Sequence, residues 1–156
     1  MHHQSQVGIA LGSILVSVAG LAATLYIAYR QYRTTRDEQK LKLYDRRLQI
    51  YQHSCDYVAE IIQNGDVEYP RSIEFLRATR ESTFLFNEDI PTYLRELYKA
   101  GIDLQLVASR LNPQLPAGEE RYKLAEQQGQ LRKYFGEQAV ALPERFKKYL
   151  NLGSIS

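Results

Sequence analysis

Three side chains that can bind metal ions lie close together in the chain, namely His53, Asp56 and Glu60. An imidazole and two carboxylates can hold zinc or iron when at least three such ligands converge on one ion. Here all three would lie on one helix, and the other histidines, His2 and His3, are far away in the sequence. The Glu-x-x-His pairs of ferritin-like iron sites do not occur. A solvated polar helix face therefore explains these residues better than a metal centre.

The single cysteine, Cys55, is the one candidate thiol nucleophile in the sequence. It falls on a stripe of apolar residues, where a buried and unreactive thiol is expected. His53 is two residues away on the same predicted helix and points in another direction, so a catalytic Cys–His pair is not predicted. A single cysteine also excludes an intrachain disulfide, which fits a reducing compartment.

Arginines could form an anion or nucleotide site if they converged in space. The candidates lie on two predicted helices: Arg46, Arg47, Arg71, Arg77 and Arg80. No glycine-rich phosphate loop accompanies them, and Arg77 has the spacing of a surface ion pair with Glu81. We therefore predict no catalytic, metal-binding or cofactor-binding residue, no cofactor and no enzyme activity.

Residues 7–29 contain no charged side chain. At about 1.5 Å per residue, a helix over this run is long enough to cross a hydrocarbon layer of about 30 Å. A cleaved signal peptide would have basic residues before a shorter apolar core, whereas residues 1–6 (MHHQSQ) contain neither Lys nor Arg. The sequence predicts a transmembrane helix over residues 7–29, preceded by a short external N-terminus over residues 1–6.

Basic residues are found on one side of this predicted span. None precedes it, whereas several follow between Arg30 and Arg47, which places the N-terminus outside and the rest of the chain in the cytoplasm of a single-pass inner-membrane protein. Aromatic and basic residues are expected to anchor the span at the interface: Tyr26, Tyr29, Arg30, Tyr32, Arg33 and Arg36. The partner predicted for this basic region is the anionic inner leaflet. The formal net charge of +2 does not indicate nucleic acid.

Small residues within the predicted span could bring two helices together. Gly8 and Gly12 form a GxxxG motif, and Gly20 continues the series of small residues. Such residues allow close backbone approach in a membrane and therefore homo-oligomerisation. Two hypotheses stay open, a passive tether and a membrane-acting effector that self-associates through this helix.

Residues 30–40 are almost entirely polar and are predicted to form a basic stalk. Thr35 and Glu38 have the spacing of a capping box and allow a new helix to start there. The absence of Gly and Pro between Gly20 and Gly65 equally allows one continuous helix.

Apolar residues spaced three and four apart over residues 41–152 predict a cytoplasmic helical domain. The expected helices cover 41–64, 71–86, 90–111 and 119–142, with a final turn from Pro143. The first is expected to bury Leu41, Tyr44, Leu48, Tyr51, Cys55, Val58 and Ile62. Short connections favour antiparallel neighbours, so the predicted fold is all-α, an antiparallel four-helix bundle followed by a tail over residues 153–156.

Four segments, LYDRRLQIY, FLRATRESTFLF, IPTYLRELY and FKKYLNL, follow one another in the predicted domain. This pattern resembles small, uncharacterised bacterial single-pass membrane proteins with a cytoplasmic helical domain. The resemblance covers most of the domain and implies a bacterial inner membrane but no activity. We expect a non-catalytic interaction protein (an adaptor, regulator or assembly subunit) with an unknown protein partner. The alternatives are the self-associating effector and, less well supported, an enzyme or metal-binding bundle.

Overall fold

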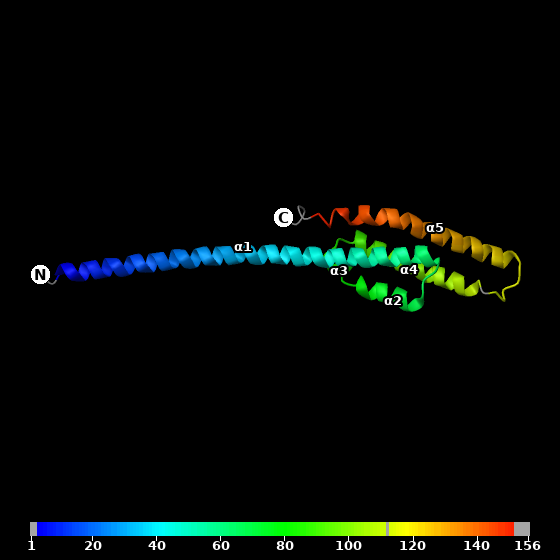
Figure 1. Ribbon diagram of the computed structural model, residues 1–156, viewed down its shortest axis with the longest axis horizontal. Coiled ribbons are helices and arrows are strands. Elements are labelled where there is room, and N and C mark those ends of the chain that lie inside the picture. Colours follow the sequence, from blue (N-terminus) through cyan, green and yellow to red (C-terminus); the bar gives the residue numbers. More distant parts are fainter. Residues whose placement is uncertain (1–2, 112, 152–156) are drawn as a thin grey trace. The chain divides into compact units, whose positions relative to one another are not determined.

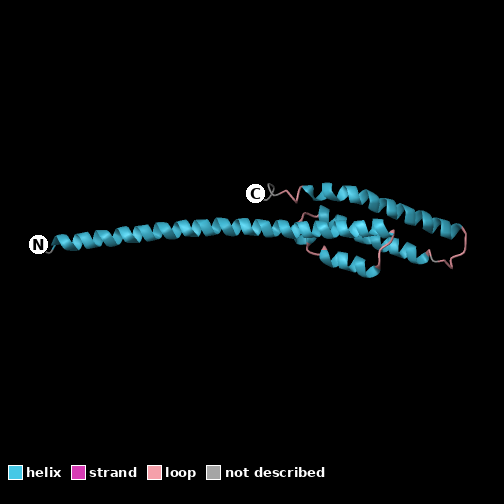
Figure 2. Ribbon diagram, in the orientation of Figure 1, coloured by secondary structure: helices cyan, strands magenta, loops and turns pink. Residues whose placement is uncertain are grey.

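The computed structural model describes residues 3–111 and 113–151, except for the side chains of residues 3–23 and 34–37. Every regular element within this range is a helix, which confirms the predicted all-α class (Figure 2). The helices are α1 (His3–Asn64), α2 (Tyr69–Ala78), α3 (Ser82–Leu85), α4 (Asp89–Arg110) and α5 (Glu119–Lys147).

The chain divides into two compact units, unit 1 (Met1–Lys42) and unit 2 (Leu43–Ser156). Unit 1 contains the residues expected to anchor a span at the membrane interface. Among those whose side chains are described, Tyr26, Tyr29 and Tyr32 are 65%, 66% and 70% exposed, and Arg30 and Arg33 are exposed as well.

No helix in the described part of the chain is both long enough and apolar enough to cross a membrane. Most of the expected span over residues 7–29 lies outside the described side chains, as do Gly8, Gly12, Gly20 and Arg36. The transmembrane helix and its packing residues therefore stay predictions.

The backbone of α1 is helical through residues 34–37, so a new helix does not start at Thr35. The helix ends at Asn64, as the Asn64–Gly65 pair predicts. Gly65 has a φ of +71°, and its N–H donates to the carbonyl of Ile61 at 2.8 Å. A residue without a Cβ adopts this left-handed conformation most easily, which is why a glycine closes the helix.

The expected second helix, over 71–86, is divided into α2 and α3. Pro70 lies in the first turn of α2, where proline is favoured. The hydroxyl of Thr79 donates to the carbonyl of Phe75 at 2.8 Å, and its N–H donates to the same oxygen at 3.0 Å.

Beyond Thr79 the backbone bonds span three residues instead of four: the N–H of Arg80 donates to the carbonyl of Arg77 at 3.3 Å, and that of Ser82 donates to the carbonyl of Thr79 at 3.0 Å. The α-helix therefore ends there, and α3 is only one turn long. A regular four-helix bundle is therefore not confirmed.

The C-terminal helix also differs from the prediction. We expected Pro143 to begin a separate turn, but α5 runs through it to Lys147. Proline removes one main-chain hydrogen bond from a helix interior. Leu142 and Phe146 on either side are 1% and 0% exposed. Their burial holds this last stretch of α5 against the core and offsets the lost bond.

The buried side of α1 is shifted from the predicted stripe. Leu41 and Ile62, expected in the core, are 55% and 47% exposed. The residues of α1 that are buried in unit 2 are Ile50, Ser54, Tyr57, Val58 and Ile61. Ser54 fits there because its hydroxyl donates to the carbonyl of Ile50 at 2.8 Å, which removes the cost of burying a polar group.

Tyr57 lies where the helices of unit 2 meet. Its ring stacks on Phe75 of α2 with centroids 4.2 Å apart and meets Phe135 of α5 edge-on at 6.4 Å. Its hydroxyl is hydrogen-bonded to Ser72 at 3.1 Å and lies against Gly101 of α4. Burial raises the pKa of this hydroxyl. In unit 2, α4 packs against α2, α3 and α5 (Figure 1), so one aromatic residue of α1 connects most of the helices.

Candidate functional site

The candidate metal ligands do not converge. His53 and Asp56 are exposed, whereas Glu60 forms an ion pair with Arg71 at 2.5 Å. Arg71 also pairs with Glu74 at 2.7 Å. Among the described residues, no group of three or more His, Cys, Asp or Glu side chains could hold a metal ion. Glu60 therefore joins α1 to α2 through an ion pair.

Cys55 is half-buried rather than buried. It lies in a small apolar depression of about 270 Å³ between α1 and α5, together with residues such as Ala59 and Ala139. The pKa of the neighbouring Tyr51 is raised, first by its hydrogen bond with Cys55 and then by burial. Tyr51 also packs against Phe146, with ring centroids 5.4 Å apart. The thiol is therefore part of a packed helix–helix contact.

The candidate arginines are used separately. Arg46 donates to Glu81 at 2.7 Å, so the expected Arg77–Glu81 pair does not form. Arg77 and Arg80 are exposed. The five arginines therefore do not line one anion pocket.

Arg47, predicted to belong to the basic region near the membrane, points into unit 2. Its Nε donates to the carbonyl of Leu85 at 2.8 Å, and one Nη donates to the carbonyl of Tyr149 at 3.5 Å. The guanidinium also lies 5.7 Å from the ring centroid of Phe86 and 5.6 Å from that of Tyr149. Arg47 thus connects α1 to the end of α3 and to the chain after α5.

Tyr93 of α4 is a buried polar residue that the sequence did not single out. It is 2% exposed, and its hydroxyl has no hydrogen-bond partner among the described residues. The guanidinium of Arg145 lies 4.3 Å from its ring centroid. Burial raises the pKa of Tyr93, although the charge of Arg145 opposes the shift. The cation over the ring favours this packing electrostatically.

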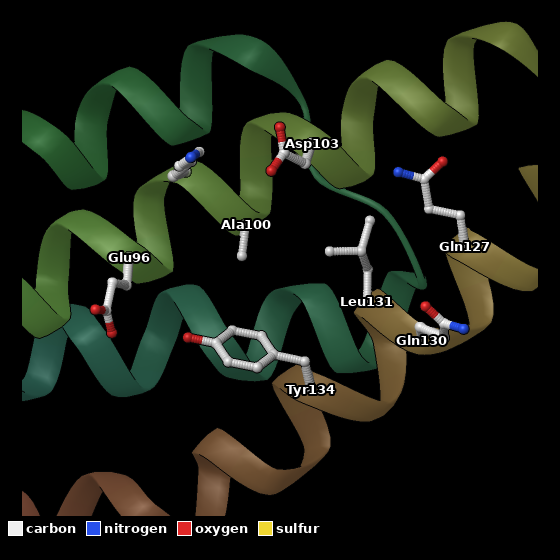
Figure 3. Close-up of a pocket in the computed structure, with 8 residues that line it drawn as sticks. Glu96, Ala100, Asp103, Gln127, Gln130, Leu131 and Tyr134 are labelled. Carbon is white, nitrogen blue, oxygen red and sulfur yellow. The ribbon is translucent and has the colours of Figure 1, made fainter.

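An open groove of about 520 Å³ runs between α4 and α5 (Figure 3). Figure 3 shows Ala100 from α4 facing Leu131 and Tyr134 from α5 across this space. These three residues are half-buried and form an apolar floor. The polar residues at its rim are Glu96, Lys99, Asp103, Gln127 and Gln130.

The chemistry of this groove suits binding. Burial raises the pKa of Tyr134, with a further contribution from Glu96, so the phenol stays neutral at physiological pH. Glu96 and Asp103 are seven positions apart on α4, about 10 Å along the helix axis. Carboxylates that share a proton must lie within about 3 Å. The groove therefore offers apolar contact and rim charges, and its two carboxylates do not share a proton.

Comparisons with family models, with curated proteins and with solved structures find no match to this chain. The functional proposals therefore rest on its own residues and their geometry.

Proposed function

We propose that the chain is a non-catalytic interaction protein of the bacterial inner membrane, an adaptor, regulator or assembly subunit. Residues 7–29 anchor it with the N-terminus outside, and unit 2 binds a protein partner in the cytoplasm. In this proposal α2 and α3 together take the place of one helix of an antiparallel bundle. The groove between α4 and α5 is the observation that carries the binding function.

The groove has the composition of a protein–protein contact, in which a buried apolar centre is surrounded by a polar rim. Ala100, Leu131 and Tyr134 supply the apolar centre. An amphipathic helix of the partner fits such a site, because its apolar side chains can occupy a groove between helices. Glu96 and Asp103 on the α4 side favour a partner with basic residues along one edge.

The membrane part of the proposal is supported by charge. The uncharged run over residues 7–29 is followed by basic residues and preceded by none, which favours a cytoplasmic unit 2. The exposed rings of Tyr26, Tyr29 and Tyr32 are available for the interface with lipid. Gly8 and Gly12 support the second candidate, an effector whose spans associate through close helix packing.

Site-specific photo-cross-linking in cells tests the binding site. A benzophenone amino acid placed at Gln130, on the groove rim, should give an adduct with the partner, because a seated helix would pass within reach of this position. Adducts are detected as bands of increased mass after purification of the chain from membranes. The matched control is Ala125, which is also exposed on α5 but does not line the groove.

We expect a strong adduct at Gln130 and only background at Ala125, since a benzophenone reacts only with groups that it contacts. Equal adducts at the two positions, or none at Gln130, would show that the groove is not the binding site.

A further inference from the structure

The segment from Leu76 to Phe84, at the end of α2 and in α3, exposes apolar side chains. Phe84 is 88% exposed and Leu76 is 41% exposed. In the one-turn helix α3, Ser82 and Leu85 face inward, which leaves Phe84 pointing to solvent. An exposed phenylalanine has a free-energy cost in water that a contact would remove.

Surplus positive charge accompanies these apolar side chains. The three acidic residues nearest to them each form an ion pair with a cation: Glu74 with Arg71, Glu81 with Arg46, and Glu88 with Arg95. Arg77 and Arg80 are exposed, and no described side chain pairs with either guanidinium. This segment therefore presents two available cations beside an exposed aromatic ring.

The same segment lies at a defined end of unit 2. Figure 1 shows α3 at the end that also holds the start of α4 and the last turns of α5. The bond from Arg47 to the carbonyl of Leu85 fixes α3 against the first residues of unit 2. In the chain, Arg47 follows the proposed span by 18 residues, about 27 Å of helix, so a contact of this segment with lipid requires α1 to be inclined to the bilayer.

We infer that this segment is a peripheral membrane contact for a bilayer rich in anionic lipid. Phe84 and Leu76 enter the boundary between headgroups and acyl chains, and Arg77 and Arg80 pair with lipid phosphates. Aromatic residues flanked by arginines bind such surfaces through apolar burial together with electrostatic attraction. The inference rests on the membrane setting proposed above, and it adds a second point of attachment that belongs to unit 2.

The absence of tryptophan from the chain gives a direct test. The full-length Phe84→Trp variant is placed in vesicles of phosphatidylcholine, with or without phosphatidylglycerol. With phosphatidylglycerol we expect its emission to shift to the blue and to be quenched by brominated acyl chains. Tyr122→Trp is the matched control, because Tyr122 is 74% exposed but lies near the start of α5, far along that helix from its last turns. Its emission should stay that of a water-exposed indole.

The charge contribution is tested in the Phe84→Trp background. Arg77→Gln and Arg80→Gln together should abolish both the blue shift and the quenching. Arg95→Gln, which removes a cation already paired with Glu88, should leave both unchanged. A shift of equal size without phosphatidylglycerol would overturn the electrostatic part of the inference.

Water-like emission in both lipid mixtures would overturn the contact itself. A blue shift of the emission that requires added membrane proteins would assign the segment to a protein partner and would also overturn the lipid contact. Alkaline extraction of the same vesicles separates this result from the proposed anchor. If alkali releases the chain, the proposed transmembrane anchor is wrong. The emission of Phe84→Trp after the chain is mixed with anionic vesicles then still decides whether the segment contacts lipid.

Discussion

Replacing Gly101 by alanine should destabilise unit 2 by about 3 kcal/mol, the upper part of the usual range for overpacking a core. A Cβ at this position would lie 1.8 Å from the hydroxyl oxygen of Tyr57 and 3.0 Å from its Cζ. Tyr57 is fully buried, stacked on Phe75 and hydrogen-bonded to Ser72. It cannot move away without breaking these contacts. Urea unfolding of the full chain in mild detergent, followed by circular dichroism, measures the loss.

Two other glycines provide controls for this substitution. A Cβ at Gly129 or Gly136 of α5 would meet nothing within 4 Å. Alanine there should raise stability by roughly 0.5–1 kcal/mol, because it restricts the unfolded chain and favours helix. Tyr57→Phe should partly rescue Gly101→Ala, since it removes the clashing oxygen. A Gly101→Ala variant as stable as Gly129→Ala would contradict the packing described here.

Two phenylalanine substitutions of identical chemistry should differ strongly. Phe135→Ala should cost about 3–5 kcal/mol, the usual range for removing a buried ring, because Phe135 is 0% exposed and contacts Tyr57 and Tyr134. Phe84→Ala should change stability by less than about 0.5 kcal/mol, as at other exposed positions. Shifts of the urea midpoint in the same detergent measure both effects.

The sequence places both rings on predicted helices without distinguishing them, so the comparison tests the environments that the structure gives to each. If Phe84→Ala cost more than about 1 kcal/mol, its ring would be packed rather than exposed, and the lipid contact inferred for α3 would lose its basis. If Phe135→Ala cost less than this, the contact between α1 and α5 would be wrong.

Helix boundaries with strong local signals could be predicted from the sequence. Gly65 ends α1 because it adopts a positive φ, Pro70 lies in the first turn of α2, and Glu119 begins α5. The break after Ala78 was missed because neither Gly nor Pro marks it in the sequence, although the backbone bonds change there from i→i−4 to i→i−3. Pro143 was misjudged because its neighbours are buried deeply enough to keep the helix intact.

Side-chain environments that depend on contacts between helices were harder to predict. Ser54 is fully buried, whereas a serine in a helical pattern indicates a surface position. The predicted buried face of α1 was therefore one position away from the observed one. Arg47 was counted with the basic region near the membrane because its two carbonyl acceptors, in α3 and in the chain after α5, are distant in sequence. A local charge pattern cannot show such partners.

The groove escaped sequence reasoning for a similar reason. Leu131 and Tyr134 fit a core stripe, and their half-exposure arises from the separation between α4 and α5, which no periodicity encodes. The small residue Ala100, facing them from α4, was the one available signal.

The membrane topology is the claim on which the whole account depends. Alkaline phosphatase, which is active only outside the cytoplasm, is fused after Ser156, and green fluorescent protein is fused there in a parallel strain. We predict that the phosphatase fusion is inactive, that the green fluorescent protein fusion is fluorescent, and that the chain stays in the membrane pellet after alkaline extraction. An active phosphatase, or release of the chain by alkali, would contradict the proposed protein with a cytoplasmic, membrane-anchored unit 2.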